Sequence, residues 1–199
     1  MNQIEIQLRA ITPAWGQRHI EETLNGNTDA AFSLFCSMND TQRAAATILL
    51  FQQIPVSVYQ VILGSTWNQA HRHIIAAAKE AFIEIADLFQ YAAFPVNHLP
   101  ERIRVWRGSS ALTIEECSSG NSWTTDRDTA CWFAMRFAEK NGSPLVIAAD
   151  IHRDDVFYSS NERNENEVLL FDTPDHYWID GSPEDWMKGC ERYEVMKDA

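Results

Sequence analysis

Two different patterns of apolar residues meet near Pro100, and together they predict a mixed α+β fold. Before this point, apolar residues recur at three- and four-residue steps, which is typical of an amphipathic helix; they are Trp67, Ala70, Ile74, Ala78, Ala81, Ile85, Leu88 and Ala92. After it, residues 102–107 alternate between polar and apolar, as in a strand. We therefore expect a single domain in which a helical N-terminal part, residues 1–100, packs on a strand-rich part, residues 101–199.

Cap and stop residues divide the N-terminal part into helices. Helices are expected from Thr12-Pro13 to Asn25, from Asp29 to Phe35, from Thr41 to Gln53, from Pro55 to Leu63, and from Ser65 or Thr66 to Phe94. Gly64 and Pro95 are expected to end the last two of these helices, since both residues disfavour helix continuation.

Alternation and turn residues predict the elements of the C-terminal part. Strands are expected at 102–107, 122–125, 145–149 and 168–170, with a strand edge at 157–158 and helices over 113–119 and 127–140. Gly108 is expected to end the first strand, and Asp126 is expected to cap the second helix.

Composition limits the class of protein. The chain of 199 residues is 45% apolar and 22% charged, which is ordinary for a globular protein. Its net charge of −12 argues against nonspecific binding to nucleic acids or anionic membranes. No apolar run approaches the roughly 18 residues of a membrane span, and no signal peptide is evident. We therefore expect a cytoplasmic protein without membrane contact.

Metal binding is not expected. His71 and His73 lie two residues apart on a predicted helix and so face different sides. The remaining histidines lack ligand spacing, and the four cysteines form no C-x-x-C pair, so reduced thiols are expected.

Glu165 and Glu167 form the most informative local pattern. They lie two positions apart directly before the apolar residues 168–170. Because alternate residues of a strand face the same side, both carboxylates are expected to project together from the start of a buried strand. Glutamates at a strand start are more often a polar rim, so this pattern alone does not establish a site.

Three motifs occur in a fixed order along the strand-rich part. They are Trp106-Arg107-Gly108, Ser122-Trp123-Thr124 and Glu165-Asn166-Glu167. The second is followed by Asp126 and then by Ala130, Phe133 and Ala134 on a predicted helix. Between about Ile103 and Phe171, this region resembles the Arg–Ser–Glu class of mono-ADP-ribosyltransferases, including toxin-like members from bacteria and phages. The resemblance implies the split β-sheet core of that family and NAD as co-substrate, without a metal.

The resemblance assigns catalytic roles to four residues, and elementary chemistry agrees with them. Glu167 would stabilise an oxocarbenium-like state and bond the ribose hydroxyl, while Glu165 would orient and deprotonate the acceptor. Ser122 would fix the rotamer of Glu167 by a hydrogen bond. Arg107 would bind the pyrophosphate bidentately.

Further residues are expected to bind NAD. Gly108 would let the backbone approach the nicotinamide amide closely, because glycine has no side chain. Thr124 would support the layer that holds Ser122. Trp123 and Phe133 are candidates for holding the nicotinamide ring, and either of them is equally explained as core.

The E-x-E pattern of this family favours an arginine side chain of a protein as the acceptor. Alternatives are an RNA or DNA acceptor, for which several arginines could line a local basic face, simple NAD hydrolysis, and a non-catalytic copy of the fold. A toxin of this kind would act in the cytoplasm of a host or target cell, and an antitoxin or inhibitor that blocks Glu167 is an expected partner.

Overall fold

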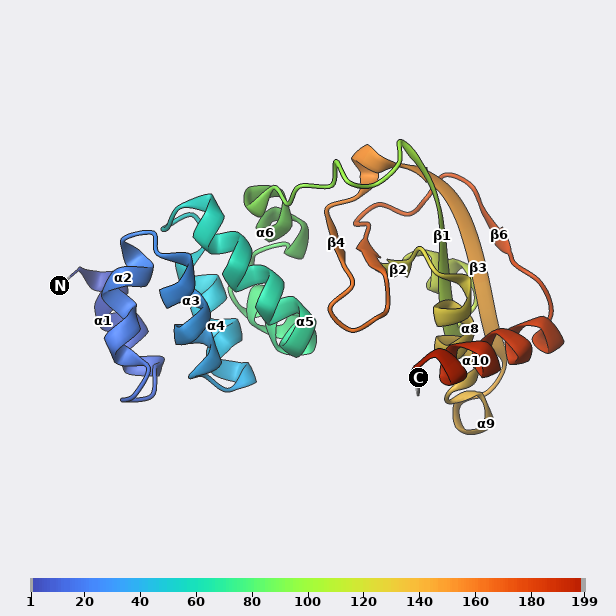
Figure 1. Cartoon of the computed structure of the whole chain (residues 1–199), viewed down its shortest axis with the longest axis horizontal. Coiled ribbons are helices and arrows are strands. Elements are labelled where there is room, and N and C mark those ends of the chain that lie inside the picture. The colour runs from blue at the N-terminus through green and yellow to red at the C-terminus, as the bar shows by residue number, and fades with distance from the viewer. Residues whose placement is uncertain (1, 198–199) are drawn as a thin grey trace. The chain divides into compact units, whose positions relative to one another are not determined.

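The computed structural model describes residues 2–197, and the chain divides into two compact units, Met1–Phe94 and Pro95–Ala199. The described residues of the first unit form helices without strands, whereas the second unit contains a β-sheet with helices (Figure 1). The fold is therefore mixed α+β, as the sequence predicts. The division at residues 94 and 95 lies close to the change of pattern near Pro100.

The first unit is a set of short helices and one long helix. They are α1 (Gln3–Ile11), η1 (Gln17–His19), α2 (Ile20–Leu24), α3 (Thr28–Cys36), α4 (Asp40–Leu50), α5 (Val56–Glu80) and α6 (Ile85–Ala92). Asn27 and Asn39 cap α3 and α4 through their side chains, so these helices begin close to the predicted positions.

The predicted helix from Thr12 to Asn25 is wrong, because Thr12 follows a helix instead of starting one. Its hydroxyl donates to the carbonyl of Leu8 over 2.6 Å, which completes the end of α1. A threonine hydroxyl is able to satisfy either end of a helix, so the sequence alone did not settle which end Thr12 serves. The segment after it forms η1 and α2.

The predicted break at Gly64 is also wrong, since α5 runs through this residue, is kinked at Ala70 and ends at Glu80. Gly64 is buried, so packing against neighbouring helices outweighs the cost of about 1 kcal/mol for glycine inside a helix. The predicted helix to Phe94 is instead two helices, α5 and α6, separated by Phe82 with its positive φ of 55°.

The second unit is built on a six-stranded sheet in the order β4-β5-β2-β1-β3-β6. Every neighbouring pair is antiparallel. The strands are β1 (Arg102–Ser110), β2 (Ser122–Thr124), β3 (Pro144–His152), β4 (Tyr158–Ser160), β5 (Glu167–Leu169) and β6 (Tyr177–Ile179). The helices are α7 (Ile114–Ser118), α8 (Arg127–Met135), α9 (Ala138–Asn141), η2 (Arg153–Asp155) and α10 (Pro183–Lys197).

Most predicted elements of this unit are confirmed, with three corrections. Gly108 lies inside β1 and does not end it. The predicted helix 127–140 is divided into α8 and α9. Glu165 lies outside β5, which begins at Glu167.

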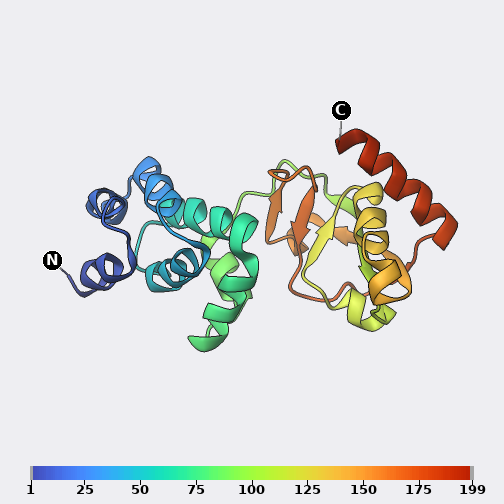
Figure 2. The same ribbon diagram turned by 90° about the horizontal axis from the view of Figure 1, so that it is seen from below.

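The two faces of the sheet carry different cores. Ile103 and Val105 of β1 join Trp123 of β2 in a cluster on one face. The alternate residues Trp106 and Gly108 face α8 on the other. Helix α10 packs against α8, and the two helices lie alongside one another (Figure 2).

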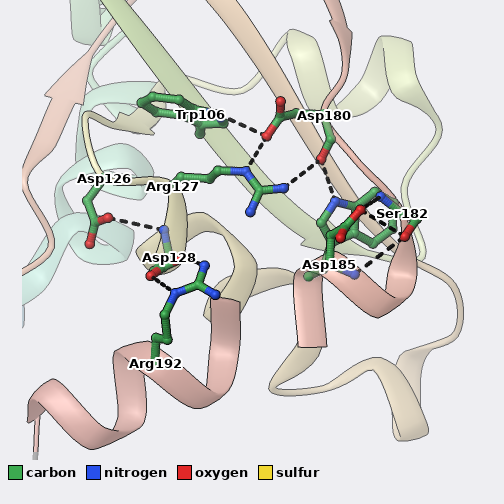
Figure 3. Close-up of polar contacts among 9 residues, drawn as sticks. Trp106, Asp126, Arg127, Asp128, Asp180, Ser182, Asp185 and Arg192 are labelled. Atoms are coloured by element: carbon green, nitrogen blue, oxygen red, sulfur yellow. Dashed lines mark hydrogen bonds and ion pairs between the residues drawn. The ribbon is translucent and has the colours of Figure 1, made fainter. Parts of the chain in front are cut away.

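Asp180, just after β6, ties the start of α10 to the sheet. Its carboxylate accepts hydrogen bonds from the indole N–H of Trp106 over 3.1 Å and from Nε of Arg127 over 2.6 Å (Figure 3). Its backbone carbonyl accepts from the indole N–H of Trp186 over 2.6 Å. One residue therefore fixes β1, α8 and α10 relative to one another.

Replacement of Asp180 by alanine is expected to reduce the free energy of unfolding by about 1–3 kcal/mol, because Trp106 and Arg127 lose a partly buried partner. Urea unfolding followed by tryptophan fluorescence measures this change. The matched control is Asp175→Ala at an exposed position, expected to change stability by less than about 0.5 kcal/mol. Equal stability of the two variants would contradict the anchoring role of Asp180.

Candidate active site

A cavity of about 210 Å³ in the second unit brings the three sequence motifs together. Every residue that the sequence predicts for the site lines it. These residues are Arg107, Gly108, Ser122, Trp123, Thr124, Phe133, Glu165 and Glu167. Trp106 and Ala130 complete the wall. Residues up to 61 positions apart, from Trp106 to Glu167, therefore meet around one space.

Glu167 is the most buried acid of the site, with 5% of its surface exposed. Pairing of β2 with β5 places Thr124 opposite Glu167, and Ser122 is its diagonal neighbour on the same face. The hydroxyl of Ser122 donates to Oε1 of Glu167 over 2.5 Å. A buried carboxylate is costly unless it is hydrogen-bonded, so this bond both satisfies the acid and fixes its direction.

Glu165 reaches the cavity by a route that the sequence analysis did not predict. Asn164 and Asn166 on either side of it have positive φ angles of 57° and 46°. The segment is therefore a sharp bend, and the predicted strand alternation is not what brings the acids together. Asparagine tolerates this backbone region better than most residues, which explains the Asn-Glu-Asn spacing. Thr124 holds the bend by donating its hydroxyl to the carbonyl of Glu165 over 2.6 Å.

Arg163 bridges the two acids. Its Nη2 lies 2.9 Å from Oε2 of Glu165 and 3.3 Å from Oε2 of Glu167. Arg163 was not among the predicted site residues, although it stands two and four positions before the acids in an R-x-E-x-E pattern. A cation at that spacing is a usable signal for a carboxylate pair that needs a counter-charge.

The environment of Glu165 favours its protonated form. Burial raises the pKa of this carboxyl, and the neighbouring charge of Glu167 raises it further. Arg163 opposes both effects by attracting the ionised form. Glu165 is thus an acid whose proton affinity is set by its surroundings, as expected for a group that exchanges a proton during a reaction.

Arg107 occupies the gap between β1 and β2. These strands pair at a single position, Trp106 with Thr124, and beyond it the guanidinium of Arg107 donates from Nη1 to the carbonyl of Ser122. Its Nε is buried and has no hydrogen-bond partner within residues 2–197. Burial lowers the pKa of Arg107, while Cys117 and Glu167 oppose the shift. The guanidinium is therefore an incompletely satisfied cation in the cavity wall.

Two glycines shape the surroundings of Arg107. A Cβ atom on Gly120 would lie 2.1 Å from Nη2 of Arg107, so glycine leaves room for the guanidinium. A Cβ atom on Gly108 would lie 1.7 Å from the carbonyl oxygen of Ala130. The missing side chain of Gly108 thus has a packing role against α8, which the sequence analysis did not include.

The aromatic residues of the cavity differ in how far they are buried. Trp123 belongs to the hydrophobic core, and only 2% of the residue is exposed. Its indole N–H donates to the carbonyl of Gly120 over 2.9 Å. Phe133 is half-buried and makes an edge contact with Trp132. Trp106 is also half-buried and was not predicted as a binding residue. Phe133 and Trp106 therefore present the more accessible aromatic surfaces.

The two buried cysteine thiols of this unit are not activated as nucleophiles. Cys117 and Cys131 are free, buried thiols. Burial raises the pKa of Cys117 and raises that of Cys131 to about 11, so neither forms a thiolate readily.

Within residues 2–197, no cluster of His, Cys, Asp and Glu side chains has the arrangement of a metal site. None of the helices in the same range combines the length and apolar character needed to traverse a bilayer.

No protein-family model, curated protein or solved structure matches this chain. Similarity therefore assigns no function to the cavity, and the contacts of its own residues are the basis for a proposal.

Alanine at Gly108 and alanine at Gly120 are expected to have different effects. Gly108→Ala drives a methyl group into the backbone of α8 and is expected to lower the free energy of unfolding by about 1–3 kcal/mol or more. Gly120→Ala meets only the end of the Arg107 side chain, which is able to move aside, so the loss is expected to be smaller. Urea unfolding of both variants checks the order; a larger loss for Gly120→Ala would contradict it.

Proposed function

We propose that this protein is an NAD-dependent mono-ADP-ribosyltransferase that releases nicotinamide and transfers ADP-ribose to an arginine side chain of a target protein. The observation that carries the proposal is the buried Glu167, clamped by Ser122 and sharing one cavity with Arg107 and Glu165. These four residues are the catalytic set that the family resemblance implies.

The chemistry of NAD cleavage fits this arrangement. Breaking the bond between nicotinamide and ribose develops positive charge on the anomeric carbon, and a preorganised carboxylate stabilises that charge. Glu167 supplies the carboxylate, and its bond to Ser122 holds it in one direction before the substrate arrives. Because the acid is already shielded from water, its charge acts more strongly than it would in bulk solvent.

The size and lining of the cavity suit one end of NAD. Pockets that hold a whole drug-sized ligand usually have volumes of roughly 300 Å³ or more. The volume here is about 210 Å³, so the cavity would enclose only the nicotinamide and its ribose. Trp106 and Phe133 line the cavity and supply aromatic surface for the ring. Arg107 lines the same cavity and brings a guanidinium charge for a phosphate oxygen, although its Nε is buried and its Nη1 already bonds Ser122.

The acid pair supports a guanidine as the acceptor. Glu165 and Glu167 already hold a guanidinium, that of Arg163, at hydrogen-bond distance. An incoming arginine would make the same charge-assisted contacts, and Glu165, with its raised pKa, would take its proton. Carboxylates discriminate in favour of such a cation and against the phosphates of a nucleic acid.

The strand arrangement also supports the proposed family. The two halves of the sheet, β4-β5-β2 and β1-β3-β6, are paired at only one position. We regard this as the split core of an ADP-ribosyltransferase, with the catalytic residues at the split. A toxin-like enzyme that modifies a protein in the cytoplasm of a target cell, and that is held inactive by a partner covering Glu167, is the setting we propose.

Glu167→Gln is expected to reduce nicotinamide release from NAD by about 100-fold or more, because the amide removes the charge that stabilises the transition state. Chromatographic measurement of free nicotinamide in the purified protein checks this. The matched control is Glu162→Gln, an exposed acid of the same loop, which is expected to retain wild-type activity. Full activity of Glu167→Gln would refute the proposed function.

Glu165→Ala is expected to abolish transfer to a guanidine such as agmatine while slow NAD hydrolysis continues, since only transfer needs the acceptor to lose a proton. In the wild type, transfer requires the ionised form of Glu165, so the rate is expected to fall as the pH drops through its raised pKa. Hydrolysis is expected to lack this acid limb. Transfer and hydrolysis with identical pH profiles would remove Glu165 from this role.

A further inference from the structure

The bridge from Arg163 to the acids has a geometry that goes beyond charge balance. One nitrogen, Nη2, contacts Oε2 of both Glu165 and Glu167, over 2.9 Å and 3.3 Å. An acceptor arginine in the proposed reaction would need to place a nitrogen against the same two oxygens. Arg163 therefore occupies the position of the acceptor with a group of the same chemistry.

Arg163 also leaves the proposed substrate space open. It is not among the residues that line the cavity of about 210 Å³, whereas both acids are. The nicotinamide end of NAD and the guanidinium of Arg163 would thus contact the acids together without competing for one volume. The side chain of Arg163 is 36% exposed, which leaves room for an attached group to extend into solvent.

The loop around Arg163 is held in place by its own backbone. The backbone N–H of Asn164 donates to the carbonyl of Asn161 over 3.0 Å, and the N–H of Asn166 donates to the side chain of Asn161 over 3.1 Å. These bonds close the segment into a compact turn with Arg163 inside it. The guanidinium is consequently presented to the acids by a braced loop, which lowers the entropic cost of reaction.

We propose that Arg163 is itself an acceptor, so that the enzyme attaches ADP-ribose to its own Arg163 within one chain. This inference rests on the proposed transferase function and adds a modification site to it. The structure favours reaction within the chain because the acids and the guanidinium are already in contact before any target binds.

The reaction balances with NAD as the only other reactant. A bond forms between Nη2 of Arg163 and the anomeric carbon of the nicotinamide ribose, while the bond from that carbon to the ring nitrogen breaks. Nicotinamide leaves as a neutral molecule with the electron pair of that bond. Glu165 takes one proton from the guanidinium and passes it to solvent, and the product guanidinium keeps a single positive charge. Burial of Glu165, which favours its protonated form, assists this transfer.

Incubation of the full chain with NAD, followed by proteolysis and mass spectrometry, tests the inference. One ADP-ribosyl group is expected on the peptide that contains Arg163. Arg163→Lys, which keeps the charge and lacks the guanidine, is expected to lose this label. The matched control is Arg136→Lys. Arg136 also interacts electrostatically with Glu165 but does not bridge the two acids. In this variant, the label on Arg163 is expected to persist.

Agmatine is added to the same reactions, so that loss of self-modification is distinguished from loss of transferase activity. Modified agmatine together with unmodified Arg163 would overturn self-modification and leave the transferase function standing. Absence of any nicotinamide release would overturn both.

A mixed reaction tests whether modification stays within one chain. Wild-type protein is combined with a Glu167→Gln chain of different size that retains Arg163. Label confined to the wild-type chain is expected, whereas equal labelling of both chains would contradict a reaction within one molecule.

Discussion

The hydrogen bond between Ser122 and Glu167 is the interaction on which the rest of the site depends. It joins β2 and β5 on the face that lines the cavity, and together with the contact from Arg163 it satisfies an acid that is only 5% exposed. Without it, one oxygen of a buried carboxylate would lose its hydrogen bond, which is costly, and the direction of Glu167 would no longer be fixed. The pairing register of two short strands thus determines where a buried negative charge lies.

The surrounding framework keeps that charge next to a gap in the sheet. Strands β1 and β2 pair at one position, and the guanidinium of Arg107 continues the connection by bonding the carbonyl of Ser122. Gly108 lets α8 approach β1 closely, while Asp180 ties Trp106 to α8 and α10. The cavity is therefore bounded by elements that are each fixed by specific contacts, which is the condition for preorganised electrostatics.

The sequence predicted much of this unit because its signals are local and consistent. Alternation located β1, an apolar run located β3, and the order of three motifs located the lining of the cavity. Glu165 shows where such reasoning fails: strand alternation suggested a shared face with Glu167, but left-handed Asn164 and Asn166 bring the acids together through a bend. Two glutamates spaced two positions apart fit both a strand and a sharp bend. Only the flanking asparagines, which tolerate positive φ, indicate the bend.

The helical unit was harder to divide, for a related reason. Thr12 and Gly64 carry signals that fit more than one outcome, and burial in the assembled unit decides between them. Arg163 was missed because its role exists only after the loop folds back onto two acids. The motifs therefore identified which residues line the cavity, whereas tertiary packing determined how they reach it and what balances their charge.

We propose that the cavity beside Glu167 holds the nicotinamide end of NAD. A crystal structure with a non-hydrolysable NAD analogue tests it most directly. We expect the nicotinamide ring between Trp106 and Phe133, with a ribose hydroxyl on Glu167. An analogue bound elsewhere on the molecule, or no binding at saturating concentration, would contradict it.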